Sequence, residues 1–73
     1  MEEFIQNFAD MFDDTDISQI NAETEFQDLD EWGSLMTMST IAMVRTKYGK
    51  AISGKEIHSC ETVADLFNLV SDK

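Results

Sequence analysis

Apolar residues recur at helical spacing in three separate segments, and this periodicity restricts the chain to an all-helical fold. The first segment runs from Glu2 to Asp13 and places five apolar side chains on one face: Phe4, Ile5, Phe8, Met11 and Phe12. The second runs from Ser34 to Tyr48, and the third begins at Thr62. No stretch alternates between apolar and polar residues as a half-buried strand does. We therefore expect a principal helix in each segment.

Local signals predict where these helices begin and end. Ser34 has the properties of an N-cap, and Gly49 those of a helix stop. Ser53 and Glu56 have the spacing of a capping box, which predicts a short third helix. Thr62 begins the last helix in a similar way, and the expected buried face of that helix consists of Val63, Leu66, Phe67 and Val70.

The second predicted helix carries apolar residues on more than one side. A broad stripe is expected to face the core: Leu35, Met38, Ile41, Ala42 and Tyr48. Met36 and Met43 fall across the helix from this stripe. Two interpretations of these methionines stay open, namely gap-filling in the core and an adaptable surface for a partner.

The twenty residues from Asp14 to Gly33 have no sustained period. We expect a long loop, held to the core by isolated apolar residues: Ile17, Ile20, Phe26, Leu29 and Trp32. Loops of this length in compact domains often carry function. The expected fold is a small four-helix bundle with a long first loop and a short third helix.

Length and charge restrict the classes of function that the chain can have. The 73 residues are sufficient for one domain, and the net charge of −10 makes a nucleic acid an unfavourable partner. The first 33 residues hold eleven acidic residues and no lysine or arginine, which favours docking to basic protein surfaces. The acidic N-terminus differs from a secretory signal, and no apolar run is long enough to insert into a membrane. A cytoplasmic monomer is expected.

Enzyme and metal chemistry find little support. His58 and Cys60 are two residues apart, and no acid is placed by sequence to complete a triad with them. Asp28, Asp30 and Gly33 match part of a calcium-binding loop, but Trp32 and Ser39 occupy positions where that loop needs ligands. The single cysteine excludes a disulfide within the chain. We therefore predict a protein that is not an enzyme and has no metal site.

The segment from Leu29 to Leu35 is the most informative, because it places a serine hydroxyl where the loop meets a helix. Ser34-Leu35 resembles the end of the Asp-Ser-Leu motif of acyl carrier proteins, and Phe26 to Leu29 resembles their upstream Phe-x-x-Leu. Later residues resemble the family's Ile…Ile…Thr-Val-x-x-Leu run: Ile52, Ile57, Thr62, Val63 and Leu66. The resemblance extends over nearly the whole chain.

The resemblance implies that Ser34 bears a covalent 4′-phosphopantetheine arm, whose thiol holds acyl or aminoacyl groups as thioesters. A helix N-terminus would favour the phosphate through its unpaired N–H groups. The implied partners are a phosphopantetheinyl transferase and acyl-loading, ketosynthase or acyltransferase enzymes.

The chain departs from the family at two places. Gly33 stands where the family has Asp, and the helix after Ser34 lacks the usual acids and carries Arg45 and Lys47. These departures leave fatty-acid synthesis and a specialised pathway as equal alternatives. The rival interpretation is a small acidic interaction module in which Ser34 only caps a helix. A hydrolase that uses Ser34 would lack a base.

Overall fold

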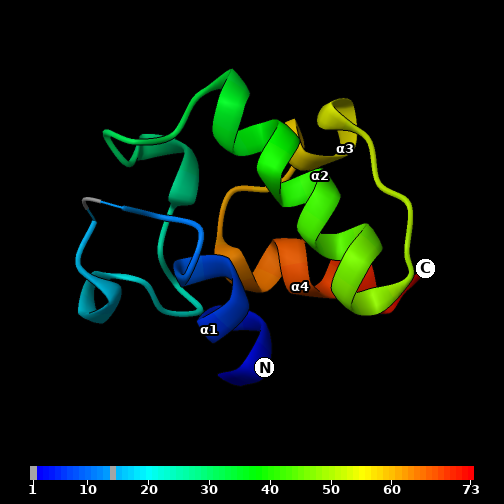
Figure 1. The fold of residues 1–73 in the computed structure, drawn as a ribbon, viewed down its shortest axis with the longest axis horizontal. Coiled ribbons are helices and arrows are strands. Elements are labelled where there is room, and N and C mark those ends of the chain that lie inside the picture. Colours follow the sequence, from blue (N-terminus) through cyan, green and yellow to red (C-terminus); the bar gives the residue numbers. More distant parts are fainter. Residues whose placement is uncertain (1, 14) are drawn as a thin grey trace.

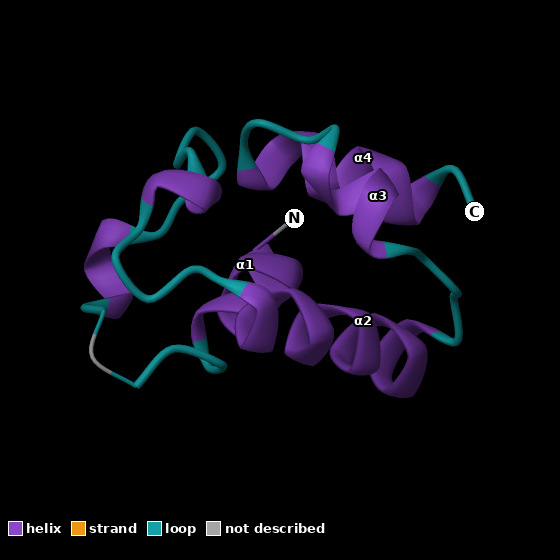
Figure 2. Cartoon of the chain, turned by 90° about the horizontal axis from the view of Figure 1, so that it is seen from above, coloured by secondary structure: helices purple, strands orange, loops and turns teal. Residues whose placement is uncertain are grey.

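The computed structural model describes residues 2–13 and 15–73, and within them it contains helices and no strand. The described residues form four α-helices, labelled in Figure 1, and two 3₁₀ turns, in this order: α1 (Glu2–Ala9), η1 (Ile17–Gln19), η2 (Phe26–Asp28), α2 (Ser34–Tyr48), α3 (Gly54–His58) and α4 (Val63–Ser71). This arrangement confirms the predicted all-helical fold with a long first loop and a short third helix. Figure 2 shows α2 along one side and α3 with α4 along the other, while the first loop gathers at one end.

Helix α1 is shorter than predicted, although its apolar face is used as expected. Phe4, Phe8 and Phe12 are buried, but the helix ends at Ala9 instead of Asp13. After Ala9 the main-chain bonds tighten, because the N–H of Met11 donates to the carbonyl of Phe8 and that of Phe12 to Ala9. Bonds between residues three apart are those of a 3₁₀ turn, which commonly ends an α-helix. The tightened turn redirects the chain while Phe12 stays in the core.

The first loop is fixed to the rest of the molecule by side chains and by main-chain bonds. Ile20 and Phe26 are buried, and Leu29 and Trp32 pack partly against the core. The prediction for Ile17 concerns a side chain outside the described part. The loop carbonyls of Thr24 and Ala22 accept from the first N–H groups of α4, at 3.0 and 2.9 Å. The loop therefore supplies acceptors that the start of a helix cannot find within itself.

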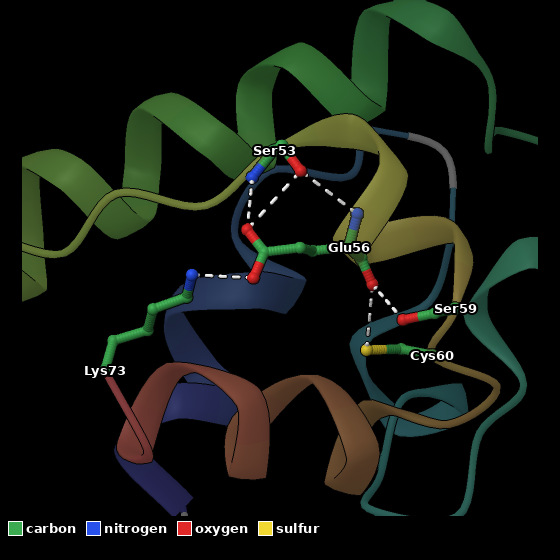
Figure 3. A network of polar contacts seen from close by, with 5 residues as sticks. All are labelled: Ser53, Glu56, Ser59, Cys60 and Lys73. Carbon is green, nitrogen blue, oxygen red and sulfur yellow. Dashed lines mark hydrogen bonds and ion pairs between the residues drawn. The ribbon is translucent and has the colours of Figure 1, made fainter.

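Both predicted capping boxes are present. The Ser53 hydroxyl accepts from the N–H of Glu56, and the Glu56 carboxylate accepts from the N–H of Ser53 at 3.1 Å. Thr62 and Asp65 make the corresponding pair at the start of α4. Figure 3 shows that the same Glu56 carboxylate also pairs with the Lys73 ammonium, at 2.6 Å. Gly49 ends α2 in the left-handed conformation, with φ of 65°, as its identity predicted.

The expected core face of α2 is wrong for most of its residues. Leu35 and Met38 are 75% and 67% exposed, whereas Met36 and Met43 are 8% and 7% exposed and belong to the core. Ala42 is also exposed, and Ile41 and Tyr48 are half-buried. The structure therefore settles the two open methionines in favour of core packing.

Two buried threonines explain this orientation of α2. Thr37 and Thr40 face the core, and their hydroxyls donate to the carbonyls of Gly33 and Met36, at 3.0 and 2.8 Å. A threonine hydroxyl that is bonded to its own helix is satisfied without water, so the methyl side can be buried. The threonines thus occupy core positions, which their polarity did not predict. The larger apolar residues Leu35 and Met38 lie at the surface instead.

Candidate functional site at the start of α2

Ser34 is the first residue of α2 and is exposed, but it does not cap the helix. Gly33 occupies the N-cap position, with φ of 178° and ψ of −167°, and makes no side-chain cap bond. The predicted N-cap role of Ser34 is therefore wrong by one residue, because Ser34 already has helical geometry. Within the described part of the chain, its hydroxyl has no hydrogen-bond partner. This correction applies also to the rival interpretation, which gave Ser34 only the role of a helix cap.

The first turn of α2 presents unpaired donors around Ser34. Thr37 directs both its N–H and its hydroxyl to the carbonyl of Gly33, at 2.9 and 3.0 Å. The N–H groups of Ser34, Leu35 and Met36 precede this first helical bond, and no residue that the structure describes accepts from them. Unpaired N–H groups together with the positive end of the helix dipole favour an anion, such as a phosphate, at this position.

Aromatic packing fixes the residue pair before Ser34. The Trp32 ring meets Phe26 edge-on at 4.8 Å between centroids and lies 6.2 Å from Phe8. The N–H of Trp32 also donates to the carbonyl of Leu29 at 2.9 Å. Trp32 thus anchors the end of the long loop in the core, and the next two residues leave the core at a defined place.

Glu31 holds the same segment from its other side, a role that sequence reasoning missed. Its carboxylate accepts from the N–H groups of Asp13 and Thr15, at 3.0 and 2.5 Å. These bonds connect the chain after α1 to the segment that precedes Ser34. In the sequence, Glu31 is one of many acids of the first loop, and no local signal distinguished it.

The other serines are less suited to carry an added group at a helix start. The hydroxyls of Ser53 and Ser59 are bonded within the α3 region, the latter to the carbonyl of Glu56 at 2.6 Å. Ser18 pairs with Asp16, and its N–H and hydroxyl lower the pKa of that carboxyl. Ser39 is half-buried in the middle of α2. Ser71 is exposed, but it lies at the end of α4, where the helix dipole disfavours an anion.

Neither the backbone conformation nor a lack of space requires a glycine at position 33. Its φ is extended, and a Cβ built at this position would have no atom within 4 Å. The Cβ of an aspartate, the residue that acyl carrier proteins usually have before the serine, therefore has room at this position. The departure of this chain from the family concerns the chemistry of the side chain only.

The remaining sequence candidates do not form a catalytic or metal site. His58 is exposed and Cys60 is buried; both line a hollow of about 210 Å³ together with Asp28. Burial raises the pKa of the Cys60 thiol, whose Sγ lies 3.5 Å from the carbonyl of Glu56. A neutral, buried thiol is a poor nucleophile. The described residues contain no group of three metal-ligating side chains, and Asp30 lies exposed in the loop.

Comparison with known proteins agrees with this arrangement. A family model described as the phosphopantetheine attachment site matches residues 3–70. Neither the curated proteins nor the solved structures gave a match to the chain.

None of the helices in residues 2–13 and 15–73 has the length and apolar character needed to span a membrane. The family match confirms the predicted resemblance and cofactor, 4′-phosphopantetheine held covalently on a serine, and the donors around Ser34 fit its phosphate. The chain therefore belongs to the phosphopantetheine-attachment family, the non-catalytic carrier domains that act with a phosphopantetheinyl transferase and acyl-handling enzymes.

Proposed function

We propose that Ser34 bears the phosphopantetheine arm and that the chain holds acyl or aminoacyl thioesters on it for partner enzymes. The observation that carries this proposal is the exposed, unbonded hydroxyl of Ser34 beside three unpaired N–H groups of α2. The bound arm supplies a terminal thiol, which holds the cargo as a thioester. The chain supplies the position of that arm and a surface for its partners.

Attachment requires a base that this site does not offer. The bond from Ser34 Oγ to phosphorus forms, the pyrophosphate bond of coenzyme A breaks, and adenosine 3′,5′-bisphosphate leaves. The hydroxyl proton goes to a base of the transferase, since the described residues include no hydrogen-bond acceptor for it. The resulting phosphodiester keeps a negative charge, which the first turn of α2 stabilises. No acid occurs between Ser34 and Gly49 to oppose it.

Intact mass spectrometry tests the assignment of Ser34. Incubation with coenzyme A and a broad-specificity transferase should add one phosphopantetheine to the wild type and none to Ser34→Ala. Ser71→Ala is the matched control, because Ser71 is exposed and also lies at a helix end. It should be modified like the wild type. Modification of the Ser34→Ala variant would refute the assignment.

The surface around Ser34 is divided between two kinds of contact for a partner. On the loop side, Asp28 and Asp30 are exposed acids. On the helix side, the exposed side chains include two large apolar residues and two basic ones: Leu35, Met38, Arg45 and Lys47. Charge complementarity steers association between carriers and enzymes. A mildly basic helix therefore supports a dedicated partner of a specialised pathway over a fatty-acid enzyme that recognises an acidic helix.

Acyl transfer at low salt tests this partner choice, since surface charges are least screened there. Arg45→Glu in the holo-protein should improve exchange with a fatty-acid synthase enzyme and weaken exchange with a dedicated partner. Met38→Glu should also weaken the dedicated partner, because it places a charge in an apolar contact. Met43→Glu is unsuitable for this test, because Met43 is buried and the variant would lose stability. If the wild type already exchanged acyl groups with the fatty-acid synthase enzyme as well as an authentic fatty-acid carrier does, the proposal of a specialised pathway would be wrong.

A further inference from the structure

The four methionines in the described residues differ in their exposure to solvent. Met36 and Met43 belong to the core and are 8% and 7% exposed, and Met11 is half-buried against the core. Met38 is 67% exposed and is not one of the apolar side chains that pack against the core in the described structure. Its thioether is therefore the methionine sulfur of this part of the chain that a reagent in solution reaches most readily.

Met38 also lies close to the proposed attachment site. It is four residues after Ser34, so the two side chains share one face of α2 and are one turn apart. Leu35, next to Ser34, is 75% exposed, and it and Met38 are the large exposed apolar residues of the described chain. An enzyme that approaches the Ser34 hydroxyl along this face of α2 therefore meets Met38 as well.

A peroxide converts an accessible thioether into a sulfoxide. A lone pair of the Met38 sulfur attacks one oxygen of hydrogen peroxide, the S–O bond forms while the O–O bond breaks, and water leaves after proton transfer. The sulfur is oxidised by two electrons and the peroxide is reduced by two. The product carries an oxygen that accepts hydrogen bonds, in place of an apolar surface. Such an oxygen, if covered by apolar atoms without a donor, lowers the affinity of the contact.

The other oxidisable sulfur of the described chain is protected. Cys60 is 6% exposed, and burial raises the pKa of its thiol, whereas the reactive form is the thiolate. Met38 lies at the surface, so its oxidation places no polar group in the core. A low concentration of peroxide should therefore change the surface beside Ser34 and leave the fold intact.

We propose that Met38 is a site of reversible oxidation and that its sulfoxide weakens the binding of enzymes that act on Ser34. This inference rests on the proposed function, because it takes Ser34 as the attachment site. In the reduced chain, the Met38 thioether makes an apolar contact with the enzyme, and the sulfoxide removes this contact. Methionine sulfoxide reductases reverse the change with a dithiol, which becomes a disulfide while the sulfoxide oxygen leaves as water.

Peptide mapping by mass spectrometry after limited treatment of the apo-protein with hydrogen peroxide tests the site. Met38 should be oxidised first, and faster than Met36 and Met43 by about eightfold or more, the ratio of their exposed fractions. In urea the three rates should become similar, because the fold no longer protects the core residues. Oxidation of Met36 or Met43 as fast as that of Met38 in the folded chain would overturn the assignment.

Kinetics of arm attachment test the consequence, with coenzyme A and a broad-specificity phosphopantetheinyl transferase as the probe. In the apo-protein with one added oxygen, the KM for the chain should rise by about fivefold, because one unpaired polar group is covered. The kcat should stay the same, since the Ser34 hydroxyl is unchanged. Treatment with both reductases should restore the original KM. Thermal unfolding of the same samples should give equal Tm values.

Met38→Leu is the matched control, because leucine is apolar and has no sulfur. It receives the same peroxide treatment, and each protein is compared with its own untreated sample. The KM of the Met38→Leu variant should not respond to peroxide. An unchanged KM in the oxidised wild type, an equal rise in Met38→Leu, or a rise that comes with a lower Tm would overturn the inference. Absence of added phosphopantetheine in the untreated wild type would instead refute the proposed function.

Discussion

Replacement of Gly33 by aspartate should stabilise the chain, because the start of α2 has space and donors for a capping side chain. No atom lies within 4 Å of the Cβ position, and the extended φ of Gly33 is open to any residue. The N–H groups of Leu35 and Met36 have no acceptor in the described structure. The carboxylate that Gly33→Asp introduces would accept from one of them, as N-cap side chains do.

Three contributions set the size of this effect. Aspartate is a better N-cap than glycine by a few tenths of a kcal/mol, about 0.3. Removal of a glycine restricts the unfolded chain and contributes about 0.4–1 kcal/mol. The charge at the helix N-terminus adds about 0.3–1 kcal/mol, and the nearby loop acids oppose this part. We expect a net gain of about 1 kcal/mol, which corresponds to a rise in Tm of about 4–8 °C for a domain of this size.

Thermal unfolding followed by circular dichroism measures the effect, and two further variants separate its causes. Gly33→Ala has the same restriction of the unfolded chain without a cap, and Gly33→Asn adds the cap without the charge. The expected order of Tm is Asp above Asn, and Asn above Ala. Modification of Gly33→Asp by a transferase that recognises the family's aspartate should also be faster than that of the wild type. If Gly33→Asp were no more stable than Gly33→Ala, the uncapped start of α2 would not be a source of instability.

Three further outcomes follow from the caps and the buried thiol. Thr62→Ala should lower the free energy of unfolding by about 0.5–2 kcal/mol, while Ser34 can still be modified. Thr62→Ser keeps a hydroxyl and should restore most of the loss. Equal Tm values for the wild type and Thr62→Ala would contradict the cap. The hydrogen bond from Lys73, followed by that from Ser53, lowers the pKa of Glu56. The ionised Glu56 carboxylate therefore contributes to stability above the ordinary carboxyl pKa, and this contribution is lost as the pH falls through the lowered pKa. The difference in urea midpoint between wild type and Glu56→Gln should therefore shrink from about pH 6 to about pH 3, and a constant difference would contradict this. Because Cys60 is buried and its pKa is raised, a thiol reagent at neutral pH should label the arm of the holo-protein and leave the folded apo-protein unlabelled; rapid labelling of the apo-protein would contradict the burial.

The helix boundaries were largely predictable, because they depend on neighbouring residues. Ser53 with Glu56 and Thr62 with Asp65 form capping boxes that the spacing alone identifies. Gly49 adopts the one backbone conformation for which glycine is favoured. The early end of α1 was not predictable, since the 3₁₀ turn after Ala9 preserves the apolar spacing that a longer helix would have.

The orientation of α2 was not predictable from periodicity, because apolar residues surround this helix. Met36 and Met43 on one side compete with Leu35 and Met38 on the other, and hydrophobicity alone does not choose between them. Thr40 decides the outcome with a fully buried side chain, whose hydroxyl bond to its own helix is visible only in three dimensions.

The position of the candidate site was predictable, whereas the contacts that hold it were not. Ser34 stands at the loop–helix junction that its neighbours in the sequence indicated. The contacts of Glu31 with residues 13 and 15 join segments that are distant in the sequence. The Gln27 amide likewise donates to the carbonyl of Cys60 at 2.6 Å, and more distantly to those of Ile57 and His58. Such side-chain contacts leave no local pattern.

These long-range contacts explain how an uncapped helix start can still hold a serine in a defined place. The loop is attached to α4 through Thr24 and Ala22, to the end of α3 through Gln27, and to the turn after α1 through Glu31. Trp32 then fixes the last part of the loop in the aromatic core. Each attachment lies outside the first turn of α2, so none of them uses the N–H groups that surround Ser34. The fold therefore positions Ser34 by means of the loop and leaves the donors of α2 available for a phosphate.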